Sequence, residues 1–126
     1  WTGKHVHQYW LENDDSAPPM PEDAILLGDF NLDPTNPEYD LLAGPSDGKG
    51  GRFVYQEGFV DAWVAAGHEE GDGVTLPANP GSGPATDHRF DYAFLTESLA
   101  SQVRSAEVDM AAQGSDHQPF WIDIDW

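Results

Sequence analysis

Short apolar blocks alternate with polar stretches along this chain, and the spacing within each block predicts its secondary structure. The unbroken apolar run 24–27 predicts a strand over 24–30 covered on both faces, because its apolar side chains do not alternate with polar ones. In residues 90–95 an aromatic ring occupies every second position, which predicts a strand with Asp91 on the opposite face. Two more strands are predicted over 102–109 and 118–125; the last places Phe120, Ile122, Ile124 and Trp126 on one face.

Helices are predicted between the first two strands and ahead of them. The run Asn36-Pro37-Glu38 combines an N-cap residue, a first-turn proline and an acid at the positive helix end, so a helix should begin there and end at Gly44. The apolar spacing over 59–66 predicts a second helix, closed by Gly67. A short amphipathic helix is predicted over 4–12.

Polar segments rich in Gly and Pro separate these elements. Residues 13–23, 46–51 and 68–88 are expected to be loops, and the longest should lie over or beside a functional site. Strands and helices in this mixed order predict a layered α+β fold and not a helix bundle. The 126 residues suit a single domain with its own core.

The chain is strongly acidic, with 23 Asp and Glu against 5 Lys and Arg and a formal net charge of −18. Such a surface repels nucleic-acid phosphates and attracts metal cations, although the same charge can serve solubility alone. The absence of Cys excludes disulfides, thiol catalysis and thiolate metal sites. No apolar stretch is long enough to span a membrane, so a soluble protein is expected, with its compartment left open.

Three segments at predicted strand ends carry acid, amide and imidazole side chains. They are Gly28-Asp29-Phe30-Asn31, Arg89-Phe90-Asp91-Tyr92 and Ser115-Asp116-His117. Hydrolysis of a phosphate ester needs a divalent cation, a group that orients or activates water, and a donor to the phosphate. Because the segments supply these residue types, they predict one metal-dependent phosphoryl site assembled from distant parts of the chain.

Asp29 and Asn31 lie two residues apart and therefore share one side of an extended strand. Asp29 can then orient or activate water while Asn31 donates to a phosphate oxygen. The alternative is an ordinary Asp-Asn turn that only ends the strand.

Asp116 and His117 are adjacent, so on an extended backbone one can reach a metal ion and the other the substrate. Asp91 is the predicted partner that fixes the tautomer of His117. Alternatively, Asp91 forms a structural ion pair with Arg89 or Arg104.

The remaining histidines are weaker candidates. His88 precedes the second segment and is predicted either to contact the substrate or to be an ordinary loop residue. His5, His7 and His68 are expected to be surface residues, because nothing near them completes a metal-ligand set.

In this order, Gly-Asp-Phe-Asn, Arg-Phe-Asp-Tyr and Ser-Asp-His resemble the motifs of the endonuclease/exonuclease/phosphatase superfamily, the pancreatic-deoxyribonuclease-like fold. The resemblance covers about residues 24–126, and Thr75-Leu76-Pro77 is similar to that family's T-x-P lead-in. It implies a layered α/β sandwich and a metal-dependent phosphoric ester hydrolase, either a phosphodiesterase or a phosphatase. Mg²⁺ is the implied cofactor, with Mn²⁺ or Ca²⁺ as alternatives.

The resemblance also implies roles for single residues. Asp29 looks like the acid that orients the attacking water and contacts the metal ion, and Asn31 like its phosphate-contacting companion. Asp116 resembles a metal-associated acid. Asp91 resembles the acid that pairs with the motif histidine, His117, which acts as a base or steadies the phosphoryl oxygens.

Members of this superfamily are about twice this length, near the upper range for one domain. Their first half provides a metal-binding Glu, an Asn and another catalytic His, so the chain resembles the C-terminal half. We therefore expect one mostly antiparallel sheet with flanking helices in a single partial domain over 1–126. The isolated chain should be weakly active or inactive, and it should self-associate or pair with the missing N-terminal half.

The few basic residues favour a phosphorylated small molecule, a phospholipid headgroup or a short oligonucleotide over duplex DNA as the partner. Two other functions remain as alternatives: a non-catalytic binding module on the same scaffold, and an acidic calcium-binding structural domain.

Overall fold

The computed structural model describes residues 22–55 and 58–125 of the 126-residue chain. Its elements in chain order are β1 (Ile25–Asp29), α2 (Pro37–Ala43), β2 (Phe59–Asp61), α3 (Ala62–Ala65), β3 (Asp91–Thr96), α4 (Glu97–Ala100), β4 (Val103–Val108) and β5 (Phe120–Ile124). The first sheet has the order β1-β3-β2 and the second pairs β4 with β5, all antiparallel. This confirms the predicted α+β class, with the antiparallel strands divided between two sheets instead of one.

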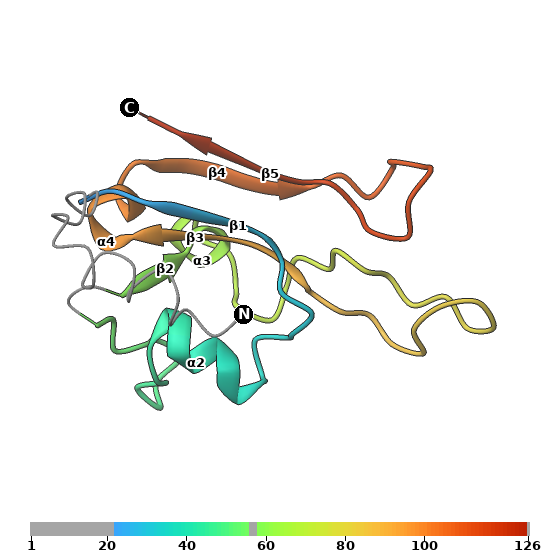
Figure 1. Ribbon diagram of the computed structural model, residues 1–126, viewed down its shortest axis with the longest axis horizontal. Coiled ribbons are helices and arrows are strands. Elements are labelled where there is room, and N and C mark those ends of the chain that lie inside the picture. Colours follow the sequence, from blue (N-terminus) through green and yellow to red (C-terminus); the bar gives the residue numbers. More distant parts are fainter. Residues whose placement is uncertain (1–21, 56–57, 126) are drawn as a thin grey trace, which may run out of the picture.

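The central strand β3 packs against a different layer on each face. On one face, Tyr92 and Phe94 form a core cluster with Tyr39 and Ala43 of α2. On the other face, Ala93 and Leu95 form a cluster with Ala62 and Leu99, and apolar side chains of β5 pack against it. Figure 1 shows the result: α2 lies on one side of the three-stranded sheet, and β4 with β5 on the other.

The predicted alternation in the last strand accounts for this layering. The side chains of Phe120, Ile122 and Ile124 pack against the core cluster, whereas Trp121 is 64% exposed.

The predictions that fall on residues 4–12, on His5 and His7, and on Trp126 lie outside the described residues.

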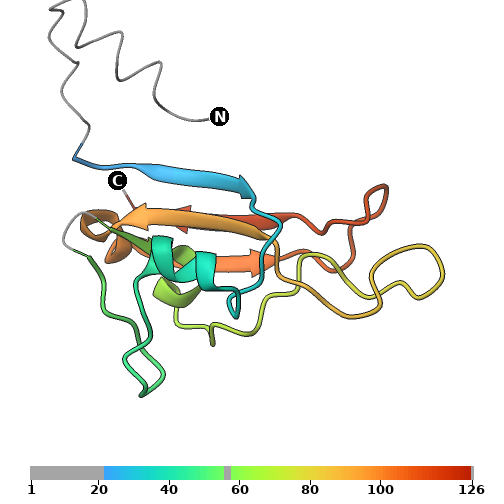
Figure 2. The same cartoon turned by 60° about the horizontal axis from the view of Figure 1, so that its bottom comes forward.

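Leu26 and Leu27 point to opposite faces of β1 and both are exposed, so the prediction that both faces of this strand are covered was wrong. Among the described residues, β1 pairs with β3 alone, at the border of its sheet (Figure 2), and Leu26 and Leu27 are 39% and 64% exposed. An unbroken apolar run reports that both faces of a strand are apolar, but not whether another layer covers them. Within the described part of the chain, nothing covers these two leucines fully.

Residues 59–66 are a strand followed by a short helix, not the single helix that the apolar spacing predicted. Phe59, Val60 and Asp61 pair with β3 as β2. Asp61 then acts as the N-cap of α3, because its Oδ1 accepts a hydrogen bond of 2.9 Å from the Trp63 N–H. Helix α2 matches its prediction better: it spans Pro37–Ala43 and ends at Gly44, whose φ of 82° suits glycine.

A buried ionic cluster ties the layers together; we call Arg89, Asp61 and Tyr39 the Arg89 cluster. Arg89 pairs with Asp61, and their side chains are only 4% and 2% exposed. The Tyr39 hydroxyl donates to Asp61 Oδ2 at 2.7 Å, and Arg89 also donates to the Glu70 carbonyl at 3.0 Å. Burial raises the pKa of the Tyr39 hydroxyl, which therefore stays protonated as a donor.

Two long loops project from the end of the layers at which β1 stops (Figure 1). One covers residues 68–88, a predicted loop in which Leu76 and His88 form an isolated backbone bridge. The other joins β4 to β5 and contains His117. None of the helices in the described ranges is long and apolar enough to cross a membrane.

Candidate active site

Two carboxylates meet where the β1–β3 ladder ends. The register places Asp29 directly opposite Asp91, as the last pair of the two strands. Phe30 extends the pairing by one hydrogen bond, from its N–H to the Phe90 carbonyl at 2.8 Å. The strand ends thus fix both acids relative to each other, although the two positions are 62 apart in the sequence (91 minus 29).

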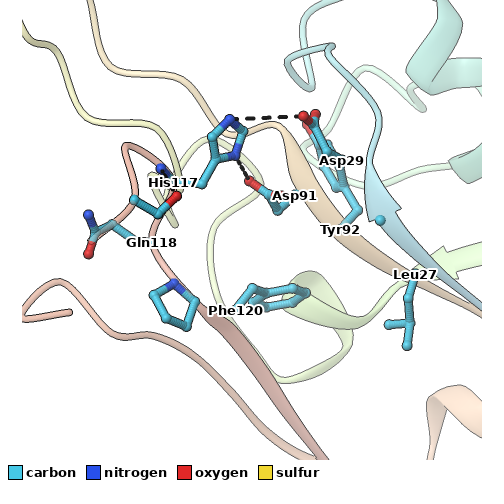
Figure 3. A pocket seen from close by; sticks show the side chains of 10 residues that line it. Leu27, Asp29, Asp91, Tyr92, His117, Gln118 and Phe120 are labelled. Carbon is cyan, nitrogen blue, oxygen red and sulfur yellow. Dashed lines mark hydrogen bonds and ion pairs between the residues drawn. The ribbon is translucent and has the colours of Figure 1, made fainter. Parts of the chain in front are cut away.

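His117 lies between these carboxylates, three positions before β5 begins at Phe120. Its Nδ1 is 2.7 Å from Asp91 Oδ2, and its Nε2 is 3.9 Å from Asp29 Oδ2 (Figure 3). Within residues 22–55 and 58–125, these three residues are the one group of potential metal ligands whose ligand atoms all lie within 4.8 Å of one another. All three side chains remain partly accessible, at 38% for Asp29, 29% for His117 and 23% for Asp91.

Asp91 controls the protonation of His117. The hydrogen bond to the Asp91 carboxylate is the largest cause that raises the pKa of His117, partial burial opposes it, and the negative charges of Asp91, Asp29 and Asp116 add to the rise. An ionised Asp91 makes Nδ1 the donor, which leaves Nε2 on the side of Asp29. The Asp91–His117 contact therefore orients the imidazole and favours its charged form.

Asn31 follows Asp29 in a tight turn. Its φ of 52° is in the left-handed region, which Asn tolerates better than most residues. Its backbone N–H donates to Asp29 Oδ1 at 2.8 Å. Because β1 ends at Asp29, the prediction that Asp29 and Asn31 share one side of an extended strand was wrong. The Asp-Asn turn that the sequence allowed as the alternative is present, and it also holds the carboxylate of Asp29. The Asn31 side chain is exposed next to it.

The two other predicted site residues lie outside the three-residue group. Asp116 is exposed and acts on His117 through its charge. His88 contacts Asp33, with 2.7 Å between its Nδ1 and Asp33 Oδ2, and its ring stacks on Phe90 with centroids 4.7 Å apart. The sequence analysis did not identify Asp33, because nothing in the sequence around this residue indicates that it contacts His88.

The alternative ion pairs of Asp91 are not formed in the described structure. Arg89 pairs with Asp61 in the buried cluster, and Arg104 pairs with Asp125 on the surface. His68, predicted as a surface residue, is exposed overall, although its ring stacks on Trp63 with centroids 3.8 Å apart.

A groove of about 490 Å³ opens beside the group. Its wall is formed by Leu27, Gly28, Asp29, Asp91, Tyr92, Ser115, His117, Gln118, Pro119 and Phe120 (Figure 3). The carboxylates and the imidazole thus lie next to apolar side chains of β1 and β5. A ligand can place a charged group at Asp29 and His117 and an uncharged group against Leu27 and Phe120.

Comparison with known protein families agrees with this arrangement. The family model described as the Endonuclease/Exonuclease/phosphatase family matches residues 3–117, which include all three motif segments. This chain belongs to the Endonuclease/Exonuclease/phosphatase family. The match also takes in residues 3–23, which the motif resemblance did not reach. No curated protein and no solved structure matches the chain.

Members of the Endonuclease/Exonuclease/phosphatase family are in general hydrolases, and they generally use divalent metal ions. The donor set in this chain can accommodate such an ion, because the carboxylates of Asp29 and Asp91 lie close together at an open groove, beside His117. Hard divalent cations such as Mg²⁺ take one or two protein carboxylates and complete their shell with water and substrate oxygens. Two carboxylates with solvent access meet that requirement.

Proposed function

We propose that this protein hydrolyses phosphate esters, as a phosphodiesterase or phosphatase, with the help of a divalent cation, Mg²⁺ in the first instance. The observation that carries the proposal is the convergence of Asp29, Asp91 and His117 within 4.8 Å, in a chain of the Endonuclease/Exonuclease/phosphatase family. The three residues come from β1, β3 and the segment before β5, so the fold, and not local sequence, brings them together.

Asp29 and Asp91 are the carboxylates that would hold the ion. Asp116, which the sequence also suggested as a metal ligand, lies outside the group and would contribute through its charge or through water. A bound divalent cation draws charge from the phosphoryl oxygens and so favours attack by water.

The protein's own side chains have separate tasks in this proposal. Asp29, more exposed than Asp91, orients the attacking water in line with the leaving oxygen. Asp91 holds the imidazole of His117, whose raised pKa keeps a proton available for the phosphoryl or leaving oxygen. The side-chain amide of Asn31 donates to a phosphate oxygen. His88, at the end of the loop over residues 68–88, adds a further contact to the substrate.

The pH dependence of turnover distinguishes two roles for His117. If the charged imidazolium donates to the substrate, turnover falls as the pH rises through the raised pKa of His117. If neutral His117 accepts the proton of water, turnover rises over the same interval. The hydrogen bond to Asp91 favours the first role, because it stabilises the charged form.

The substrate we propose is a phosphorylated small molecule, a phospholipid headgroup or a short oligonucleotide. A net charge of −18 opposes the approach of a long polyanion, and the partly apolar groove suits an ester with an uncharged portion. Duplex DNA should show no affinity even at low ionic strength, where phosphate contacts are strongest. Affinity for duplex DNA in a salt titration would contradict this part of the proposal.

We also propose that the exposed edge of β1 pairs with a further chain segment, either in a second copy or in a complementary part of the catalytic domain. Leu26 and Leu27 are exposed on a strand that has one neighbour in the described part of the chain, and such edges favour pairing. Sedimentation of the chain with and without a charge at position 27 (Leu27→Lys) tests this, since the charge should abolish the association.

The decisive experiment replaces Asp29 and His117 singly by Ala in the whole protein. Each variant should lose turnover of phosphodiester and phosphomonoester substrates by roughly 10²–10⁴-fold. Asp123→Ala, which removes an exposed carboxylate of β5, is the control and should leave turnover unchanged. Wild-type turnover in both site variants would make the assignment wrong. Phosphate binding without turnover would favour the binding module, and Ca²⁺-dependent melting without a phosphate ligand would favour the calcium-binding domain.

A further inference from the structure

We infer that Thr75 is a positioning residue of this site: it holds the strand that carries Asp91 and the segment that carries His117 in a fixed relation. The inference rests on the proposed function, but it concerns a residue outside the group of three. Thr75 lies in the long loop before β3 and is 1% exposed.

Three polar groups of Thr75 bind three parts of the backbone. Its Oγ1 accepts hydrogen bonds from the N–H groups of Phe90 and Asp91, at 3.0 and 3.1 Å. Its carbonyl accepts the N–H of Gln118 at 2.6 Å. Its own N–H donates to the His88 carbonyl at 3.0 Å. One buried residue thus bonds to Asp91 itself and to the immediate neighbour of His117.

The register of the sheet explains why a side-chain hydroxyl is needed at this point. Strand β2 ends with Asp61 opposite Phe94, so it does not reach the start of β3. The N–H groups of Phe90 and Asp91 lie beyond that end, and the Thr75 hydroxyl oxygen takes the place of a strand carbonyl. A buried N–H without an acceptor is costly, so this bond fixes the beginning of β3.

The carbonyl of Thr75 holds the segment that carries His117. Most of the loop between β4 and β5 is exposed, including Ser115 and Asp116. In the described structure, the bond from Gln118 N–H to Thr75 is the backbone hydrogen bond that ties residues 115–118 to a part of the chain outside β4 and β5. A contact of 2.7 Å between Asp91 and His117 requires both segments to be placed closely, and Thr75 touches both.

The test compares Thr75→Val with Thr75→Ser in the whole protein. Val keeps the shape and removes the hydroxyl, whereas Ser keeps the acceptor oxygen. One readout is kcat and KM for bis(4-nitrophenyl) phosphate with Mg²⁺. The other is the downfield ¹H NMR signal of the His117 Nδ1 proton that Asp91 binds, which needs neither turnover nor metal.

Thr75→Val should lower kcat by at least about tenfold with KM changed less than about threefold, and its downfield signal should be lost. Thr75→Ser should restore the signal and bring kcat to within about threefold of wild type. The inference is overturned if Thr75→Val retains the wild-type signal and kcat, or if Thr75→Ser is as impaired as Thr75→Val, because then the hydroxyl does not position the pair.

A second pair of variants applies if Thr75→Val does not fold. Gln118→Pro removes the N–H that Thr75 accepts, whereas Gln118→Ala keeps it. The NMR signal should be lost in the first variant and retained in the second; equal signals in both would overturn the inference. The outcomes separate the two proposals. If the protein has no hydrolase activity, the His117 Nδ1 proton signal still tests the role of Thr75. If the Thr75 variants keep wild-type kcat and signal while Asp29→Ala is inactive, the role of Thr75 is refuted and the hydrolase proposal stands.

Discussion

Arg89 and Asp91 are two positions apart in the chain, yet they belong to groups of opposite character. The Arg89 cluster is closed to solvent, with Arg89 and Asp61 side chains 4% and 2% exposed. The group around Asp91 opens onto a groove, and its side chains are 23% to 38% exposed. Both consist of a carboxylate facing a cationic or proton-carrying partner, so the residue types alone do not distinguish them.

The two groups differ in how many of their polar atoms already have a hydrogen-bond or ion-pair partner. Asp61 is bonded to Arg89, Tyr39 and the Trp63 N–H, and its buried side chain is closed to a ligand. In the open group, His117 Nε2 is 3.9 Å from Asp29, beyond hydrogen-bond distance. A saturated buried group stabilises the fold, whereas an accessible group with free capacity can bind and react. The two groups should therefore respond oppositely to mutation.

The largest expected effect is on stability, at Asp61. Asp61→Ala leaves the Arg89 charge buried without its partner, which typically costs about 3–5 kcal/mol of unfolding free energy. Urea unfolding followed by circular dichroism measures this loss. Asp125→Ala breaks an ion pair whose side chains are 60% and 61% exposed, and it should cost less than about 1 kcal/mol. Equal losses in the two variants would show that burial does not separate the groups.

The second effect concerns the open group and its cation. At a concentration about 100 times its Kd, Mg²⁺ should stabilise the folded protein by about 2.7 kcal/mol, and EDTA should remove this gain. Asp29→Asn should abolish the gain, whereas Asp123→Asn removes the same charge from an exposed position of β5 and should preserve it. Thermal melts with and without Mg²⁺ measure both. If Asp123→Asn also loses the gain, the cation responds to the general acidity of the chain.

The parts of this structure that could be predicted from sequence are those set by local pattern. Alternation predicted the exposed and the partly buried positions of β5, and Pro37 and Gly44 marked the ends of α2. The motif positions placed Asp29 and Asp91 at strand ends, whereas the pairing of their strands and the opposite placement of the two acids come from the structure.

What sequence could not supply depends on neighbours distant in the chain. Residues 59–61 have apolar spacing that fits a helix, but pairing with β3 makes them a strand. The exposure of Leu27 means that no layer of the described structure covers its face of β1 fully, and no pattern within β1 reports this. The bonds of Asp33 with His88, and of Thr75 with Asp91 and Gln118, join positions whose separation in sequence gave no signal.

The third effect separates the task of Asp91 from that of Arg89. Asp91→Ala removes the partner of His117, and the loss of such an orienting carboxylate typically lowers activity by about 10–100-fold. Because Asp91 is partly exposed, the fold should lose far less stability than in Asp61→Ala. Turnover assays beside urea unfolding measure both quantities. A variant that keeps its activity but unfolds readily would assign Asp91 to the structural class instead.

The smallest effect is the dependence of stability on pH through His117. Its pKa in the folded protein is raised above the ordinary value of 6.5, chiefly by the hydrogen bond to Asp91. A raised folded-state pKa means that the folded state binds the proton more tightly than the unfolded state, so the stabilisation is fully present below the unfolded pKa. It is lost as the pH rises through the folded pKa.

The stability difference between wild type and His117→Gln should therefore be largest on the acid side of about pH 6.5 and shrink above it. Urea unfolding of both proteins between about pH 5.5 and about pH 8 measures the difference. The stability difference between wild type and Asp61→Asn should not change over this pH range, because Arg89 stays charged throughout it. A difference that grows with pH would mean that His117 is held neutral, and that the open group, like the Arg89 cluster, is a structural contact.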